Sequence, residues 1–447
     1  MLPQPNATYS EDLYRFHWPS LGVECIVEGI VAEKTDIRVE ITITLVHNMY
    51  GGRLYTGHLL LLGTNSRRDV RKALEDRVPS DEFDWGGILE QICLLTRERY
   101  RRGEPVLDLA QVDYRNAVRF LLKPFVPDRA ISILYGDGGT AKSLFALAMG
   151  VCITTLTELV GMLPEKCGRI LYLDWEDDAE THAERLAAVC KGMGIDVPDD
   201  LILYQRRAER LQESTRELRR TIVEKDVVLV IVDSLGMAAG NPMDEALMLG
   251  ALKAARSFNC AVLMIHHLPK DPKDKSKPFG TVYASNEARM TWLVEASEDE
   301  GSNSLSALYT NHKWNRGRKF NRRALLAHFE TTADDELVSV KFSEGDIRLM
   351  DAFRNKLPLP QLMVKILEDY LAVRPPEAPP TLTVQEMHQR LISEGRTHSE
   401  QVVRNAFTGA KGKAVFVRFG AGFTLLSRHT EEGANNVYTL PNQGLYA

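Results

Sequence analysis

One segment of the chain joins a short apolar run, a glycine-rich turn and a helical pattern, and it constrains the fold more than any other feature. Residues 131–135 predict a buried strand, residues 136–143 read GDGGTAKS, and residues 144–153 predict a helix. Glycines let backbone N–H groups curl around a phosphate, and a helix N-terminus adds partial positive charge. Lys142 is placed to reach the β- and γ-phosphates, and the Ser143 hydroxyl to bind Mg²⁺. The segment therefore predicts a site for ATP with Mg²⁺. The residues expected to hold the nucleotide are Gly136, Asp137, Gly138, Gly139, Thr140, Ala141, Lys142, Ser143 and Leu144.

The loop departs from the usual pattern, GxxxxGK[ST], at one position. Ala141 stands where the pattern has a glycine before the lysine. An alanine suits such a loop if its backbone φ is negative. Its methyl group leaves open the possibility that the loop binds nucleotide more weakly. The alternative interpretation is a glycine-rich turn without a ligand.

Short apolar runs alternate with helical patterns along the middle of the chain. Residues 131–135, 170–174, 227–233 and 261–266 each predict a fully buried strand. This alternation favours an α/β fold with a mainly parallel sheet and crossover helices. We expect four parts: an α+β domain at 1–112 with no catalytic constellation, the α/β domain at 113–348, a mostly helical domain at 349–430 and a tail at 431–447, in which residues 437–440 are a candidate edge strand.

Composition excludes several classes of protein. The 447 residues are 44% hydrophobic and 26% charged with a formal charge of −6, which is typical of a globular protein and excludes a uniformly basic coat. The six cysteines form no CxxC pair, which disfavours a metal cluster or a disulfide framework. No signal peptide or apolar stretch of about 18 residues is found, so we expect a cytoplasmic protein without a membrane partner.

Polar residues follow the other predicted strands at the points where a phosphate site needs them. Asp233 ends an apolar strand and is the candidate Mg²⁺ ligand, with Ser234 in a local hydrogen bond. Acidic residues follow the strand at 170–174, and Glu176 is the preferred catalytic carboxylate, with Asp174 and Asp177 as alternatives. A solvated acidic loop that caps the next helix is the competing interpretation.

These motifs, in this order, resemble the RecA-like ATPase core over residues 125–320. The match includes the strand at 261–266 with the sequence HHLPK after it, and it is most similar to the branch that contains the hexameric RepA helicases of broad-host-range plasmids, with DnaB-type helicases and KaiC as more distant relatives. The resemblance implies that Lys142 and Ser143 bind nucleotide with Mg²⁺ and that Glu176 is catalytic. It also places His267 as the γ-phosphate sensor, beside His266.

The same family supplies cations from one subunit to the ATP site of the next. Lys313 and Arg316 are the candidates for this catalytic role, and Arg318 stays open because the spacing differs by one residue from the family pattern. Such residues imply a ring or filament. The lysine-rich loop at 270–277 either faces single-stranded DNA in a central channel or is simply solvated.

The C-terminal domain resembles a winged helix. Two capping boxes, at 383–386 and 397–400, predict helices separated by a turn at Gly395, and residues 414–426 predict a hairpin. The region 395–428 is locally basic, as contact with duplex DNA requires, although winged helices also bind proteins. The candidate DNA contacts are Arg396, Arg404, Lys411, Lys413 and Arg418.

The preferred function is an ATP-hydrolysing, hexameric motor on nucleic acid, such as a DNA helicase or translocase in replication or repair. An ATP-controlled DNA-binding regulator or scaffold is the first alternative. A signalling ATPase or kinase in the manner of KaiC is the second.

Overall fold

The computed structural model divides the chain into two compact units. The first holds Met1–Val294, Thr310–Asn321 and Phe329–Lys341, and the second holds Glu295–Tyr309, Arg322–His328 and Phe342–Ala447. The residues that the structure describes are 2–10, 13–46, 52–78, 83–103, 106–114, 119–268, 278–279, 282–298, 303–334, 336–347, 350–408, 416–419, 422–425, 427–429 and 437–439.

The first unit begins with an antiparallel five-stranded sheet and two helices, here called the N-terminal domain. The alternation of apolar and polar residues at 37–45 predicts a half-buried strand, and the structure confirms it, because every second side chain of β4 faces the core. Val70 of α1 and Ile88 of α2 pack in that same core. The elements are β1 (Asn6–Ser10), β2 (Leu13–Trp18), β3 (Val23–Ala32), β4 (Ile37–Leu45), β5 (Gly52–Leu60), α1 (Thr64–Glu75) and α2 (Trp85–Arg102).

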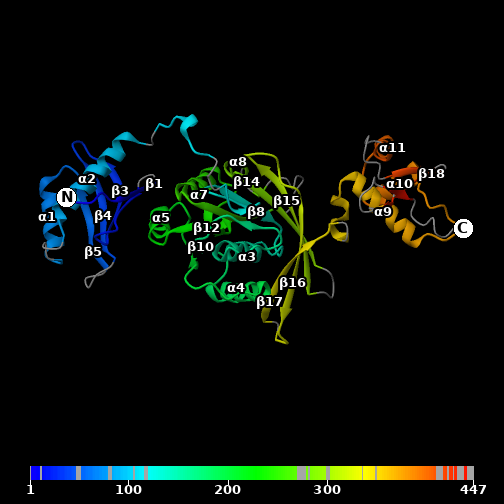
Figure 1. Cartoon of the computed structure of the whole chain (residues 1–447), viewed down its shortest axis with the longest axis horizontal. Helices are drawn as coiled ribbons and strands as arrows, with labels where there is room; N and C mark the ends of the chain where they lie inside the picture. Colours follow the sequence, from blue (N-terminus) through cyan, green and yellow to red (C-terminus); the bar gives the residue numbers. More distant parts are fainter. Residues whose placement is uncertain are drawn as a thin grey trace. The chain divides into compact units, whose positions relative to one another are not determined.

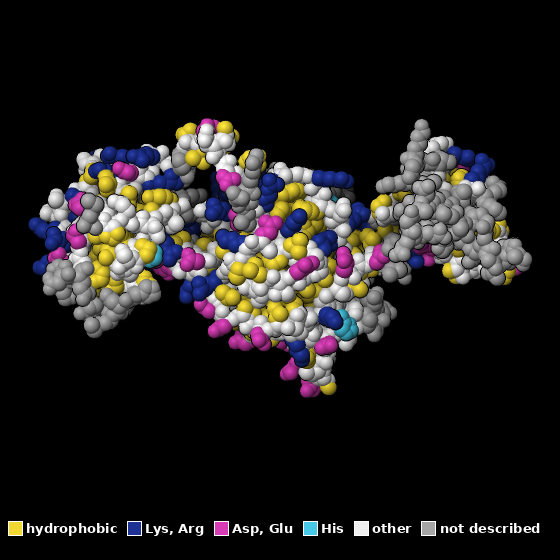
Figure 2. Space-filling model, viewed as in Figure 1, with side chains coloured by type: hydrophobic (Ala, Val, Ile, Leu, Met, Phe, Trp, Pro, Cys, Tyr) yellow, Lys and Arg dark blue, Asp and Glu magenta, His cyan; other side chains and the backbone are white. Residues whose placement is uncertain are grey.

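The segment that follows α2 contributes little packing. Its apolar side chains are largely in solvent, with Val106 and Leu109 exposed by 102% and 84%. Figure 2 shows hydrophobic side chains on the surface of this segment, which Figure 1 draws in cyan. All of the described residues of this segment, 106–114, are exposed.

A nine-stranded sheet follows, in the order β11-β10-β12-β13-β8-β14-β15-β16-β17. The strands from β11 to β14 are parallel, and β15 pairs with β16 in the antiparallel direction. The strands are β8 (Ile131–Gly136), β10 (Arg169–Asp174), β11 (Ile202–Arg206), β12 (Val227–Asp233), β13 (Ala261–His267), β14 (Met290–Glu298), β15 (Ser304–Trp314), β16 (Arg323–Thr331) and β17 (Leu337–Gly345). A separate small sheet is formed by β6 (Phe120–Lys123), β7 (Val126–Pro127) and β9 (Leu163–Pro164).

Helices cover both faces of the parallel strands, so the expected α/β class is confirmed (Figure 1). On one face, α3 approaches so closely that a Cβ added at Gly150 would lie 3.1 Å from Ile170. On the other face, Leu218 of α5, Leu235 of α6 and Met248 of α7 share a core with Val230 of β12. The helices are α3 (Lys142–Thr155), α4 (Ala179–Met193), α5 (Thr215–Glu224), α6 (Leu235–Ala239), α7 (Glu245–Ser257) and α8 (Val282–Glu287).

In the second unit, the described residues from 350 to 425 include the helices α9, α10 and α11 and the hairpin of β18 and β19, which surround a separate core. Leu367 of α9, Leu391 of α10 and Phe407 of α11 meet in this core, and Leu382 pairs with Phe423 of β19. The elements are η2 (Asp351–Lys356), α9 (Leu359–Val373), α10 (Val384–Ser393), α11 (Glu400–Thr408), β18 (Phe416–Phe419), β19 (Gly422–Leu425), β20 (Ser427–His429) and β21 (Val437–Thr439).

One of the two predicted capping boxes forms. Thr383 accepts from the amide of Glu386, whose carboxylate accepts from the amide of Thr383. The helix expected from the second box is shorter than predicted, because α11 begins at Glu400, three residues after Thr397. Residues 396–399 belong to no helix or strand and so lengthen the turn that follows Gly395.

The six cysteines are free thiols. Within the described ranges, no group of three or more His, Cys, Asp and Glu side chains is arranged to hold a metal ion. No helix in that part of the chain is long and apolar enough to cross a membrane.

Candidate ATP site at the carboxyl edge of the central sheet

The parallel strands end together and bring distant polar residues to one edge of the sheet. The register pairs Asp174 of β10 with Asp233 of β12, and His267 of β13 with Gly136 of β8. The motif residues that follow these strands therefore lie at the same level. This edge is where open α/β sheets bind their ligands.

The glycines of the phosphate loop serve different physical purposes. A Cβ at Gly136 would lie 2.2 Å from the carbonyl oxygen of Val294, so β8 and β14 pack closely only because that residue is a glycine. At Gly138 and Gly139 an added Cβ would meet no atom within 4 Å, which leaves open space above the loop. The loop thus has room for a phosphate group against its backbone.

The ammonium group of Lys142 is buried against this loop. Its Nζ donates to the carbonyls of Gly136 and Asp137, at 3.2 and 2.5 Å, and to Oγ1 of Thr140 at 3.0 Å. Burial lowers the pKa of Lys142 to about 8, although Asp233, Asp137 and Glu176 oppose the shift. A buried cation with a lowered pKa favours the arrival of an anionic ligand.

The conformation of Ala141 does not meet the condition under which an alanine suits this loop, a negative φ. Its φ is +55° and its ψ is 27°, so the residue is left-handed. Its carbonyl accepts from the amide of Phe145 and so starts α3. The alanine adopts the conformation that the usual glycine takes without strain, and its Cβ makes this costly.

Asp233 and Ser143 lie together, as a magnesium site needs. Asp233 is buried, and its Oδ2 accepts from the hydroxyl of Tyr172 at 2.6 Å. Burial raises the pKa of Asp233, while hydrogen bonds from Ser143 and Tyr172 lower it. Hydroxyl and carboxylate oxygens are the ligands that Mg²⁺ takes beside phosphates, so this pair and the open loop fit ATP with Mg²⁺.

Glu176 lies beside the residues that the resemblance selects. Its Oε1 accepts from the hydroxyl of Ser234 and lies 3.6 Å from Nε2 of His267. The contact with His267 lowers the pKa of Glu176, burial opposes this shift, and Ser234 lowers it further. The carboxylate is therefore held ionised, in the form that accepts a proton from water.

The alternative carboxylates are engaged elsewhere. Asp174 accepts from the backbone amides of Glu176 and Asp177, at 3.0 and 3.1 Å, and also contacts His182 and Tyr204. Although burial raises the pKa of Asp174, these hydrogen bonds lower it overall. Asp177 forms an ion pair with Arg185 at 2.8 Å. Asp174 thus builds the turn that carries Glu176, and a sequence pattern gave no signal for its partners on α4 and β11.

The two histidines at the end of β13 have different surroundings. His266 is buried, donates from Nε2 to the carbonyl of Phe279 at 2.8 Å, and has its pKa lowered to about 4 by burial. It is a neutral structural group. His267 is partly exposed and faces Glu176.

The candidate trans-acting cations lie around the end of β15. Nζ of Lys313 donates to the carbonyls of Ser285 and Asn286, at 2.7 and 2.8 Å, and so caps α8. Burial lowers the pKa of Lys313, as does the charge of Arg289. Arg316 and Arg318 are exposed.

The basic residues proposed for DNA contact are less uniform than the sequence suggested. The guanidinium group of Arg396 donates to the carbonyl of Leu357, which makes it a structural group. Arg404 is exposed on α11, and Arg418 is exposed on β18. Lys411 and Lys413, like the loop at 270–277, fall outside the described residues.

The conformation of Ala141 predicts that Ala141→Gly stabilises the protein. Removal of the Cβ relieves left-handed strain, offset in part by the greater chain entropy of glycine when unfolded, for a net gain of about 1 kcal/mol. Urea unfolding of the ligand-free protein measures the change. Ala148→Gly, in the helical interior of α3, is the control and should lose about 1 kcal/mol. A loss of stability in Ala141→Gly would contradict the left-handed conformation.

Comparison with known proteins finds one family model and several solved structures that are similar to part of the chain. A family model described as an AAA domain matches residues 97–273. A KaiC-like protein from the hyperthermophilic archaeon Pyrococcus horikoshii OT3 has 13% sequence identity and a TM-score of 0.36, over 50% of this chain and 93% of that one. The flagellar accessory protein FlaH from Methanocaldococcus jannaschii has 11% identity and a TM-score of 0.35, over 49% and 92%. No curated protein matches the chain. The family match, the mainly parallel sheet and the phosphate loop make the middle of the chain similar to an ATPase domain of the AAA type.

Proposed function

We propose that this ATPase domain powers a motor on nucleic acid, a hexameric DNA helicase or translocase that acts in replication or repair. The observation that carries the proposal is the position of Glu176, ionised between Ser234 and His267 at the edge that also holds the phosphate loop. The role in replication or repair rests on the resemblance to the RepA branch.

The residues of the edge divide the work of hydrolysis. Lys142, Ser143 and Asp233 would hold ATP with Mg²⁺. The ATP would supply the phosphoryl group, and the Mg²⁺ would neutralise its charge. Glu176 orients the attacking water and accepts its proton. His267 lies 3.6 Å from Glu176 and belongs to β13, which pairs with β8, the strand that leads into the phosphate loop. We propose that it couples the protonation of Glu176 to this part of the sheet.

The C-terminal domain supports the nucleic-acid part of the proposal. Its order of helix, bridged residue, two helices and hairpin supports the proposal that this domain is a winged helix. The exposed face of α11 carries Gln401, Arg404 and Asn405, side chains that hydrogen-bond to base edges and phosphates. We propose duplex DNA for this domain and single-stranded DNA for the channel of a ring.

Hydrolysis coupled to DNA is the first expectation. Single-stranded DNA should stimulate steady-state ATP hydrolysis, and the protein should separate a forked duplex, because a motor uses DNA within its cycle. Lys142→Ala is the blank, since the substitution removes the cation that meets the phosphates. Vigorous hydrolysis that ignores DNA and separates no strands would instead favour an ATP-controlled scaffold.

The contact of His267 with Glu176 predicts a pH effect. Glu176 serves as base only when ionised, and loss of the contact removes the largest cause that lowers its pKa. The acidic limb of kcat/KM should therefore move to higher pH in His267→Ala, so that activity is lost sooner as the pH falls. His267→Asn keeps a donor and should move the limb less. An unmoved limb in His267→Ala would exclude Glu176 as the titrating base.

A ring with shared sites predicts complementation between inactive subunits. Arg316→Ala and Lys142→Ala subunits should each be inactive alone, and their mixture should recover hydrolysis at interfaces that join an intact loop to an intact arginine. Arg316 is the better choice for this test because Lys313 caps α8. Arg318→Ala is the matched variant for the alternative cation. No recovery from a mixture that assembles normally would exclude Arg316 as a trans-acting group.

A further inference from the structure

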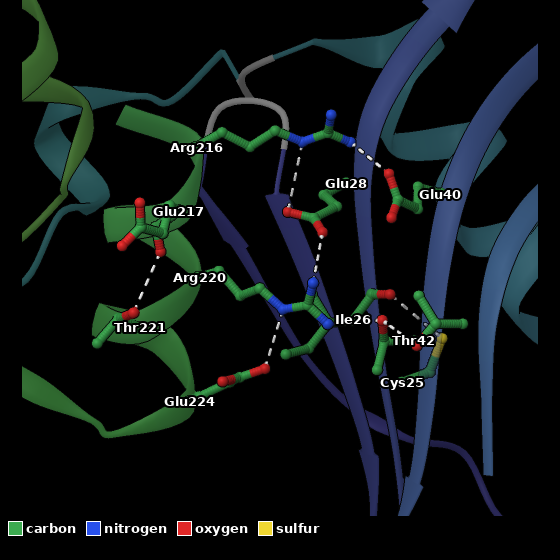
Figure 3. A network of polar contacts seen from close by, with 11 residues as sticks. Cys25, Ile26, Glu28, Glu40, Thr42, Arg216, Glu217, Arg220, Thr221 and Glu224 are labelled. Carbon is green, nitrogen blue, oxygen red and sulfur yellow. Dashed lines mark hydrogen bonds and ion pairs between the residues drawn. The ribbon is translucent and has the colours of Figure 1, made fainter. Parts of the chain in front are cut away.

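The N-terminal domain contacts the ATPase domain through charged groups of α5, and both lie in the first compact unit. Figure 3 shows Arg216 and Arg220 extending from α5 toward the carboxylates of Glu28 and Glu40. Arg216 lies 2.9 Å from Glu40 and 3.6 Å from Glu28, and Arg220 lies 3.2 Å from Glu28. Arg220 also donates to Oγ1 of Thr42 at 2.7 Å. We call these five residues the docking network.

The carboxylate of Glu28 is the centre of this network. Its side chain is 7% exposed, and burial raises its pKa while Arg220 and Arg216 lower it. A buried carboxylate without a cation is costly, so the N-terminal domain is most stable with Glu28 against these arginines. A second ion pair, between Arg15 of β2 and Asp226 at 2.8 Å, lies just beyond the end of α5.

The backbone of β3 is shaped for this contact. Its pairing with β4 shifts register between Glu28 and Val31, and Gly29 in between has a φ of +59°. A Cβ at Gly29 would lie 2.3 Å from Nη2 of Arg216. Bulges of this kind redirect side chains at edges and sites, and here the bulge leaves space for the guanidinium group.

Other contacts of α5 connect it, through Arg207, to the turn at residues 174–177 that carries Glu176. Glu217 of α5 accepts from Arg207 at 2.9 Å, and the Arg207 side chain is 7% exposed. The backbone amide of Arg207 donates to the carbonyl of Asp174 at 2.7 Å. Asp174 in turn holds the amides of Glu176 and Asp177. Hydrogen bonds and one helix thus connect Glu28 to the proposed base.

We propose that docking of the N-terminal domain on α5 sets the rate of ATP hydrolysis, with Arg207 as the positioning residue between α5 and the turn that carries Glu176. The inference rests on the proposed catalytic role of Glu176. When the docking network forms, α5 holds Glu217 against Arg207 and the turn stays in place. When it breaks, α5 loses two anchors on successive turns and the turn at 174–177 loosens.

The test compares full-length variants by hydrolysis and by amide hydrogen exchange. Arg216→Glu/Arg220→Glu should lower kcat at least about fivefold, the lower bound of ordinary coupling between sites, with KM for ATP nearly unchanged. Exchange at Glu176 and Asp177 should speed up by a similar factor. Arg38→Glu is the matched control, because Arg38 forms an ion pair within the N-terminal domain, with Glu33 at 2.9 Å. It should change neither quantity.

Two further pairs of variants distinguish a loss of docking from a loss of folding. Gly29→Ala displaces Arg216 without a change of charge, and Gly52→Ala is its control, since Gly52 also has a positive φ but an added Cβ there meets nothing within 4 Å. Arg207→Gln should lower kcat while exchange in β3 and β4 stays unchanged, and Arg207→Lys should recover part of the rate.

Hydrolysis and hydrogen exchange together distinguish a failure of the coupling from a failure of the proposed function. Faster exchange in β3, β4 and α5 with unchanged kcat and an unchanged turn would overturn the coupling. If no variant, wild type included, hydrolyses ATP, the proposed function fails. Exchange at Glu176 and Asp177 still decides in that case whether docking controls the turn: faster exchange supports the link, and unchanged exchange overturns it.

Discussion

The carboxylate of Asp174 is completely buried, and the geometry of the ATP site depends on it. This carboxylate accepts hydrogen bonds from the backbone amides of Glu176 and Asp177, in the turn at residues 174–177. It also accepts from His182 of α4 and from the hydroxyl of Tyr204 on β11. A carboxylate that accepts several hydrogen bonds stays ionised in spite of burial, because each donor replaces part of its lost hydration. One charge thereby fixes a turn, a helix and an edge strand against β10. Glu176 reaches Ser234 and His267 because this turn has one conformation.

Much of the site could be predicted from the sequence because its signals are local. The phosphate loop is a continuous segment, and apolar strands followed by Asp233, Glu176 or His267 are visible as short patterns. In a parallel sheet such strand ends necessarily meet at one edge, so placement follows from topology alone. The predicted capping box at Thr383 formed for the same reason, since its partners are three residues apart.

The rest depends on contacts between residues distant in sequence. Nothing local assigns Asp174 to structure and Glu176 to the proposed chemistry, because the difference arises from Tyr204 and His182. His266 and His267 are adjacent, yet strand alternation buries one and leaves the other facing Glu176. The φ of Ala141 is positive although alanine disfavours the left-handed region, because the requirements of the loop prevail over that preference. The docking network joins β3 and β4 to α5, which the sequence separates by more than 170 residues.

The charged groups at this edge lie in unfavourable surroundings, and their chemistry indicates what the site is suited to receive. Burial lowers the pKa of Lys142 and raises that of Asp233, so each charge is disfavoured where it lies. The two do not form a close ion pair, since Lys142 donates to the loop and Asp233 accepts from Tyr172. A ligand that carries negative phosphates and a divalent cation would favour both charges at once. The same reasoning applies to Ala141, whose strained conformation persists because α3 and the loop must meet there. The binding of such a ligand would recover the free energy of unfolding that is lost at these positions. This explains why residues of the candidate ATP site, unlike those of the N-terminal core, depart from their preferred charge state or backbone conformation.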